Sequence, residues 1–149
     1  AYMAQNLELQ PDDRVLEVGS GCGYSAAILS RLVKHVYTIE IIEWLTQVGR
    51  KNLQKAGIKN VSLRHGDGYQ GWPEEAPFDK ILLTAAAAQI PDPLKDQVKK
   101  GGSILAPVAD HIQKLILLKK NQEDIFTEHH LIYVSFVPMT GQAPPKPMK

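Results

Sequence analysis

The stretch Leu16-Glu-Val-Gly-Ser-Gly-Cys-Gly-Tyr24 decides the fold of this 149-residue chain. The apolar run Arg14 to Val18 leads into it, and a helical pattern over residues 24–34 follows it. An apolar run that ends in glycines is typical of a buried parallel strand and a tight turn. In an open α/β sheet such a turn lies at the carboxyl edge of the sheet, where ligands bind.

Strand and helix patterns alternate through the rest of the chain. Residues 114–118 and 125–137 then flank a polar turn and predict a β-hairpin. The alternation indicates an α/β fold with a doubly wound, mostly parallel sheet and a C-terminal antiparallel hairpin. Further strands are expected at 35–40, 61–65, 80–84 and 103–108, and helices at 24–34, 43–56 and 91–100. In the first of these helices Tyr24, Ile28 and Leu32 share one face.

The two ends of the chain differ from its centre. Tyr2, Met3 and Leu7 have helical spacing from the first residues, so we expect a helix already under way and further sequence upstream. The last residues, QAPPKPMK, are rich in proline. The sequence predicts one core domain over residues 1–141 and a tail over 142–149.

Composition restricts the partners. Lys plus Arg (17) nearly cancels Asp plus Glu (16), and the basic residues are scattered, so we expect no nucleic-acid partner. No apolar run approaches the ~20 residues of a membrane span. The opening AYMAQNLELQ lacks the basic region and apolar block of a signal peptide, so we do not expect it to be one. A single cysteine, Cys22, cannot form an internal disulfide. We expect a cytoplasmic protein with no membrane partner.

The glycine pattern of the turn discriminates between ligands. A dinucleotide turn has the spacing G-x-G-x-x-G, whereas Gly19, Gly21 and Gly23 give G-x-G-x-G, with Ser20 between the first two. Glu17 stands two residues before the first glycine, where a pyrophosphate would be repelled. The cationic methionine end of S-adenosylmethionine would tolerate this carboxylate. The pattern therefore favours S-adenosylmethionine over a dinucleotide.

Other candidate ligand residues follow the neighbouring strands. Glu40 ends the second strand, where an acidic residue can accept both ribose hydroxyls. Asp67 and Gly68 follow the third strand, and Asp67 could accept from the adenine amino group. Thr84 and Ala85 follow the fourth, leaving room beside the methyl group. The alternatives are a purely structural turn with an exposed Glu40, and an Asp67 that only forms a turn.

Metal or cysteine chemistry is not indicated. The five histidines show no metal-ligand spacing, so we expect no metal site. No paired base is identifiable around Cys22, which is therefore interpreted as a small turn residue rather than a nucleophile.

Beyond these motifs, the chain resembles the protein-L-isoaspartate (D-aspartate) O-methyltransferases. The resemblance runs from LELQPDDRVLEVGSGCGYSAAIL through VYTIEI to VSFVPMTG, and its most specific stretch is GDGYQGWPEEAPFD followed by TAAA and IP. It implies a fold of the class I S-adenosylmethionine-dependent methyltransferase type. It also implies methyl transfer to the free carboxylate of isoaspartyl residues in damaged proteins, with S-adenosylhomocysteine as product. A carboxylate needs no general base, so catalysis would rest on alignment and desolvation.

One element of the family pattern is missing. Its members carry a Ser-x-Pro loop just before the segment that begins here as AYM, and its serine is thought to hold the substrate carboxylate. No catalytic residue can therefore be assigned within these 149 residues. Two alternatives stay open: a donor-binding module without activity of its own, and a carboxyl methyltransferase with another peptide acceptor. We expect a monomer that acts on isoaspartyl peptides and proteins.

Overall fold

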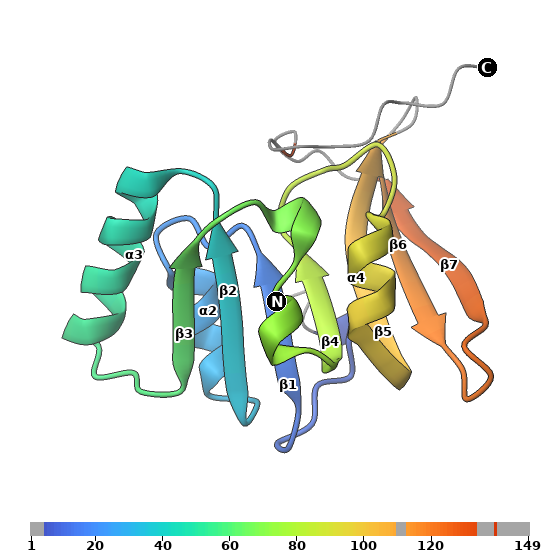
Figure 1. The fold of residues 1–149 in the computed structure, drawn as a ribbon, viewed down its shortest axis with the longest axis horizontal. Coiled ribbons are helices and arrows are strands. Elements are labelled where there is room, and N and C mark those ends of the chain that lie inside the picture. The colour runs from blue at the N-terminus through green and yellow to red at the C-terminus, as the bar shows by residue number, and fades with distance from the viewer. Residues whose placement is uncertain (1–4, 110–112, 134–138, 140–149) are drawn as a thin grey trace.

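Seven strands form one mixed sheet in the computed structural model, which describes residues 5–109, 113–133 and 139 (Figure 1). Their spatial order is β3-β2-β1-β4-β5-β6-β7. Neighbours from β3 to β5 are parallel, whereas β6 is antiparallel to both β5 and β7. The strands span Arg14–Val18 (β1), His35–Glu40 (β2), Val61–His65 (β3), Phe78–Leu83 (β4), Val98–Ala109 (β5), Gln113–Lys120 (β6) and Phe126–Tyr133 (β7). The predicted parallel sheet and antiparallel hairpin are confirmed.

Helices cover both faces of this sheet, as a doubly wound fold requires. In Figure 1, α2 lies behind the strands, and α4 and two short 3-10 helices lie in front of them. The helices span Tyr24–Ser30 (α2), Glu43–Lys55 (α3) and Asp92–Gln97 (α4), with 3-10 turns at Gly68–Gln70 (η1) and Pro73–Glu75 (η2). No helix in the described part of the chain is long and apolar enough to span a bilayer.

Two apolar cores lie on the two faces, because successive side chains of a strand point to opposite sides. In β1, Leu16 and Val18 join the core beneath α4, which also contains Phe78 and Leu94. Val15 points the other way and packs with Ala26 and Leu29 of α2 and with neighbouring strands. β1 is buried on both faces, which explains its almost continuous apolar sequence.

Several predicted elements have other bounds in the structure. The helix expected over residues 91–100 ends at Gln97, and β5 begins at Val98 rather than at Ser103. Val98 is buried and pairs with Phe78 of β4, next to a register shift in the ladder. The sequence pattern predicts a helix through residue 100, but pairing with β4 makes residues 98–100 part of a strand. The helix expected over residues 24–34 ends at Ser30, and the predicted shared face of Tyr24 and Ile28 in α2 and Leu32 beyond its end is exposed (71%, 41% and 47%).

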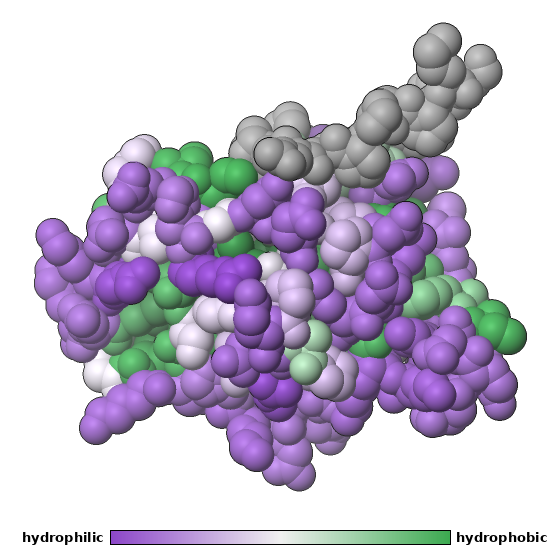
Figure 2. All heavy atoms as spheres, viewed as in Figure 1, coloured by the Kyte–Doolittle hydropathy of each residue, from purple (hydrophilic) through white to green (hydrophobic). Residues whose placement is uncertain are grey.

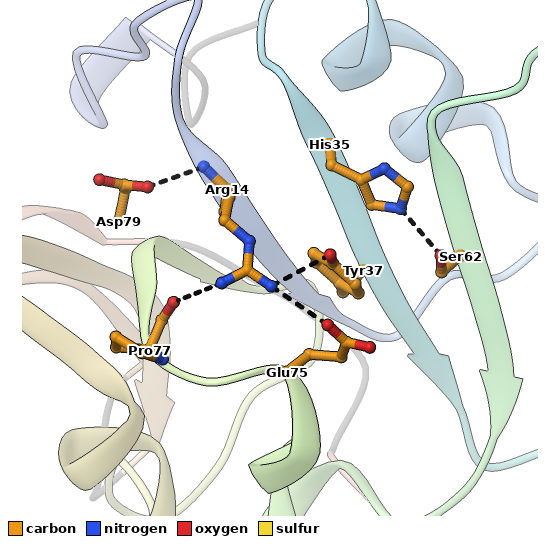
Figure 3. Close-up of polar contacts among 7 residues, drawn as sticks. All are labelled: Arg14, His35, Tyr37, Ser62, Glu75, Pro77 and Asp79. Carbon is orange, nitrogen blue, oxygen red and sulfur yellow. Dashed lines mark hydrogen bonds and ion pairs between the residues drawn. The ribbon is translucent and has the colours of Figure 1, made fainter.

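The crossover from β3 to β4 is held to the sheet by a cluster around Arg14 at the start of β1 (Figure 3). The Arg14 guanidinium donates to Glu75 of η2 at 3.1 Å, to the Tyr37 hydroxyl at 3.1 Å and to the Pro77 carbonyl at 3.2 Å. The backbone N–H of Arg14 donates to Asp79 at 2.8 Å. This cluster lies at the amino ends of the strands, opposite the glycine turn. It therefore serves the fold and not the candidate site.

Three stretches of the sequence predictions lie outside the described residues: the opening positions 1–4, positions 134–137 of the hairpin, and the tail 142–149. The division of the chain at residue 141 stays a prediction.

Candidate functional site

The glycine turn lies at the carboxyl edge of the sheet, between the ends of β2 and β4. Gly19, Gly21 and Gly23 all have positive φ (98°, 52° and 88°), a region that side chains other than glycine rarely adopt. The Gly19 N–H donates to the Ile39 carbonyl at 2.8 Å, and the Gly23 N–H donates to the Ser20 carbonyl at 2.9 Å. The turn is thus tightly coiled and fixed against β2.

Glu40 reaches from the end of β2 into this turn. One carboxylate oxygen accepts from the Gly21 N–H at 2.7 Å, and the other accepts from the Ile42 N–H at 3.0 Å. The side chain is 5% exposed. The alternative of a purely structural turn expected an exposed Glu40, and the burial of Glu40 contradicts that expectation. Because a carboxylate can accept about four hydrogen bonds, Glu40 keeps capacity for hydroxyl donors of a ligand.

Thr84 closes the other side of the turn. Its hydroxyl lies 2.6 Å from the Gly19 carbonyl oxygen and 2.9 Å from that of Val18, and its own N–H donates to Val18 at 3.0 Å. A Cβ on Gly19 would collide with the Thr84 hydroxyl oxygen. Thr84 therefore positions the turn, and Ala85 beside it is partly exposed.

Asp67 and Gly68 lie next to the same edge, because the Gly66 N–H donates to the Glu40 carbonyl at 2.9 Å. The Asp67 carboxylate accepts from the Tyr69 N–H at 3.0 Å and so caps η1. A Cβ on Gly68 would collide with the Val18 side chain. Both residues have a structural part in the η1 turn, and Asp67 keeps acceptor capacity toward a ligand.

Two buried side-chain atoms of the described residues lack any hydrogen-bond partner. They are one carboxyl oxygen of Glu17 (Oε2) and the hydroxyl oxygen of Ser20. Both residues flank Gly19. Buried polar groups are nearly always satisfied, and unsatisfied ones cluster at functional sites. Gly21 supplies the complementary feature, since a Cβ there would meet nothing within 4 Å. Open space beside the turn and orphaned polar atoms beneath it fit a polar, cationic ligand such as S-adenosylmethionine.

Sequence reasoning missed the contribution of α3 to the turn. Asn52 donates to the Cys22 carbonyl at 2.9 Å, and the backbone of Gly49 lies 3.3 Å from the Cβ position of Gly23. Thr38 of β2 was also missed, although its hydroxyl donates to Glu17 at 2.7 Å. A glycine in the middle of a helix was the available signal, because it marks a close backbone approach.

Apolar surface adjoins the polar turn. Figure 2 shows a largely hydrophilic face with hydrophobic atoms gathered at the upper end of β2, where the chain turns toward α3. Ile42, two residues after Glu40, is 41% exposed. Cys22 is exposed and free. Within the described residues no three His, Cys, Asp or Glu side chains come together as a metal-ligand set.

Comparisons with known proteins show the family of this chain. The family model of protein-L-isoaspartate(D-aspartate) O-methyltransferase matches residues 1–144. The chain belongs to this family. Protein-L-isoaspartate O-methyltransferase 2 of Nitrosococcus oceani is 50% identical over 143 residues, which are 95% of this chain and 65% of the relative. The enzyme of the same name from Polaromonas sp. is 49% identical over 144 residues, 95% of this chain and 68% of the relative. The chain thus spans about two thirds of the length of these curated relatives.

Solved structures confirm the class I methyltransferase fold. A protein-L-isoaspartate O-methyltransferase matches with a TM-score of 0.88 at 29% identity, over 94% of this chain and 46% of that protein. A Plasmodium falciparum protein, solved in complex with S-adenosyl-L-homocysteine, matches with a TM-score of 0.76 at 24% identity, over 93% of this chain and 71% of that protein.

The stretch GDGYQGWPEEAPFD, the most specific part of the resemblance to the protein-L-isoaspartate methyltransferase family, has a structural role. In the structure it forms η1, η2 and the start of β4, the crossover that the Arg14 cluster holds. Its specific residues therefore serve mainly to shape the crossover, and only its first residues reach the donor edge.

Proposed function

We propose that the glycine turn binds S-adenosylmethionine and that the protein transfers its methyl group to the free carboxylate of isoaspartyl residues in damaged proteins. The observation that carries the proposal is the turn itself. Its backbone is fixed from three sides by Glu40, Thr84 and Asn52, while Gly21 faces open space. Family membership over residues 1–144 supports the reaction. S-adenosylhomocysteine would be the product.

Each predicted residue has a role under this proposal. Glu40 would accept the ribose hydroxyls, and Asp67 would accept from the adenine amino group. Glu17 and Ser20 would face the methionine end, Gly19, Gly21, Gly23 and Gly68 would allow close approach of the backbone, and Thr84 and Ala85 would lie near the methyl group. S-adenosylmethionine supplies the electrophilic methyl carbon when bound. The chain's own part is to hold the donor and to exclude water from the edge of the sheet.

The test separates donor binding from methyl transfer. Calorimetry with S-adenosylhomocysteine should show one site, and radiolabelled methyl transfer should favour an isoaspartyl peptide over its aspartyl twin. The same two measurements are made on a chimera, in which this chain is extended by the residues of the Nitrosococcus oceani relative that lie outside the matched region. Absence of donor binding would overturn the proposed site. Donor binding without isoaspartyl-selective transfer, in the chain and in the chimera alike, would overturn the proposed acceptor.

We further propose that the protein is a cytoplasmic monomer whose partners are isoaspartyl-containing peptides and proteins. The near-neutral charge balance and the single cysteine support this setting. Light scattering after size-exclusion chromatography measures the oligomeric state, and cell fractionation measures the location.

A further inference from the structure

We propose that donor binding at the glycine turn is coupled to proton release from Glu17. The Glu17 carboxyl carries a proton in the donor-free protein and gives it to solvent when the cationic methionine end of the donor occupies the turn. No covalent bond to the donor forms or breaks in this step. The inference rests on the proposed donor site and adds a proton-linked control of its affinity.

The burial of Glu17 is the first step of the argument. Its side chain is 0% exposed, and it lies in β1 between the apolar residues Leu16 and Val18. Only one carboxyl oxygen, Oε1, has a hydrogen-bond donor, the Thr38 hydroxyl at 2.7 Å. The other oxygen has no partner. A buried carboxylate with only neutral hydroxyl groups nearby to donate to it is disfavoured relative to the neutral acid.

The charges around Glu17 act in the same direction. Among the described residues, no Lys, Arg or His forms an ion pair with it. β2 presents the Thr38 hydroxyl and the Glu40 carboxylate, α2 presents the Ser25 hydroxyl, and β4 presents Leu82 in the paired position. Burial raises the pKa of Glu17 above its usual value and the Glu40 carboxylate adds to this, against the opposing effect of the two hydroxyls.

Glu40 gives a contrast within the same site. It is also buried, but two backbone N–H groups donate to its two oxygens. Glu17 has no such donors and therefore has the most to gain from a cation. The orphaned Ser20 hydroxyl lies in the same turn. An ammonium or sulfonium group placed there would stabilise ionised Glu17, because an opposite charge nearby favours the charged form.

The experiment measures protons directly. S-adenosylmethionine is titrated into the protein in two buffers of equal pH but different ionisation enthalpy, so that the difference in heat gives the protons released. We expect a release of up to about one proton per donor, and an affinity that rises with pH by at most about tenfold per pH unit. Glu17→Gln should bind with no proton release and with a flat pH dependence. Glu43→Gln, at an exposed position of α3, should release protons as the wild type does.

A second measurement does not depend on the variant's folding. Donor-induced infrared difference spectra of the wild type should show loss of the carbonyl stretch of a protonated carboxylic acid. Donor binding without proton exchange in the wild type, or equal release in Glu17→Gln, would overturn the coupling while leaving the donor site intact. A wild type that binds no donor would overturn the proposed function as well.

Discussion

At the scale of single residues, the glycines of the turn differ in what a side chain would meet. A Cβ on Gly19 would collide with Thr84, and one on Gly23 would press on the backbone of Gly49 at 3.3 Å. Those two positions need glycine for the fold. Gly21 has a positive φ of 52° but open space around it, so only its backbone conformation and a ligand restrict it.

Gly21→Ala should therefore lose donor affinity while keeping a cooperative fold. The left-handed conformation costs alanine about 1 kcal/mol, and the added methyl group would project into the space meant for the donor. Calorimetry and thermal unfolding measure the two effects. Gly57→Ala is the matched control, because Gly57 has φ 68°, open surroundings and a position at the far end of α3. Equal donor binding by both variants would make the turn purely structural.

Glu40→Ala should weaken donor binding by about 1.5–3 kcal/mol, since hydrogen bonds to a charged group fall in that range. This corresponds to about 10- to 150-fold in Kd. The variant also frees the N–H groups of Gly21 and Ile42, so it should lower stability as well. Asn52→Ala separates the two effects, because Asn52 holds the turn through Cys22 without an acidic group for ribose. A folded Glu40→Ala protein with unchanged affinity would remove Glu40 from the site.

The pH dependence of stability follows from the raised pKa of Glu17. The folded protein binds this proton more tightly than the unfolded chain, whose glutamate has the usual value near 4.5. The contribution of Glu17 is therefore complete below that value and is lost as pH rises through the folded pKa. Glu17→Gln should remove this loss and be more stable than the wild type at neutral pH. Urea unfolding from pH 5 to pH 8 tests this; parallel curves for the two proteins would contradict it.

At the scale of elements, the crossover between β3 and β4 is held by Gln97 of α4 in addition to the Arg14 cluster. Gln97 is 7% exposed; it accepts from the Trp72 N–H at 2.9 Å and donates to the Gln70 carbonyl at 2.9 Å. A neighbouring contact places the Arg64 guanidinium 4.6 Å from the centre of the Trp72 ring. The two hydrogen bonds of Gln97 hold the crossover to α4.

Gln97→Ala should lower the free energy of unfolding by about 1–3 kcal/mol, because it removes two hydrogen bonds to the crossover backbone, each contributing about 0.5–1.5 kcal/mol. Denaturant unfolding measures the change. Gln47→Ala, at an exposed position of α3, should stay within about 0.5 kcal/mol of the wild type. A Gln97 variant as stable as the Gln47 variant would show that water replaces both hydrogen bonds.

These elements also show what local sequence patterns can predict. The strands β1 to β4 and the hairpin follow from apolar runs between turn residues, because those patterns are local. The end of α4 does not follow from a local pattern, since Val98 becomes part of a strand only by pairing with Phe78, twenty residues earlier in the chain. The buried side of α2 is equally non-local. It consists of small residues, Ala26 and Ser30, with Leu29, because the helix packs closely on the sheet.

At the scale of the molecule, the candidate site was predictable because the fold brings the strand ends together. Residues 17–19, Glu40, Asp67 and Thr84 are far apart in sequence, yet parallel strands place them at one edge. The sequence could not show which residues support the glycine turn and Glu17 from neighbouring elements. These are Thr38, Gly49 and Asn52. Such support depends on side-chain geometry across elements, and no spacing rule in a single sequence encodes it.

The roles proposed for the site residues concern binding of the donor, not of the acceptor. All the residues argued for above belong to the proposed donor site, and residues 1–149 contain no Ser-x-Pro sequence. Fixing the acceptor carboxylate in line with the methyl group can supply several of the ~7–11 kcal/mol available from orientation. A polypeptide limited to residues 1–149 should therefore bind S-adenosylhomocysteine but methylate isoaspartyl peptides slowly. A loss of about 4 kcal/mol would lower the rate on the order of a thousandfold.

The polypeptide of residues 1–149 is compared with the chimera that also carries the remaining residues of the Nitrosococcus oceani relative. Both proteins should bind the donor with similar affinity, because the turn and its supports are the same in both. Only the chimera should show fast, isoaspartyl-selective transfer, measured as radiolabelled methyl ester formed per minute. Equal and selective rates for the two proteins would mean that residues at the described edge hold the acceptor. In that case the partly exposed Ala85 and Ala88, in the segment that follows Thr84, would be the first positions to enlarge.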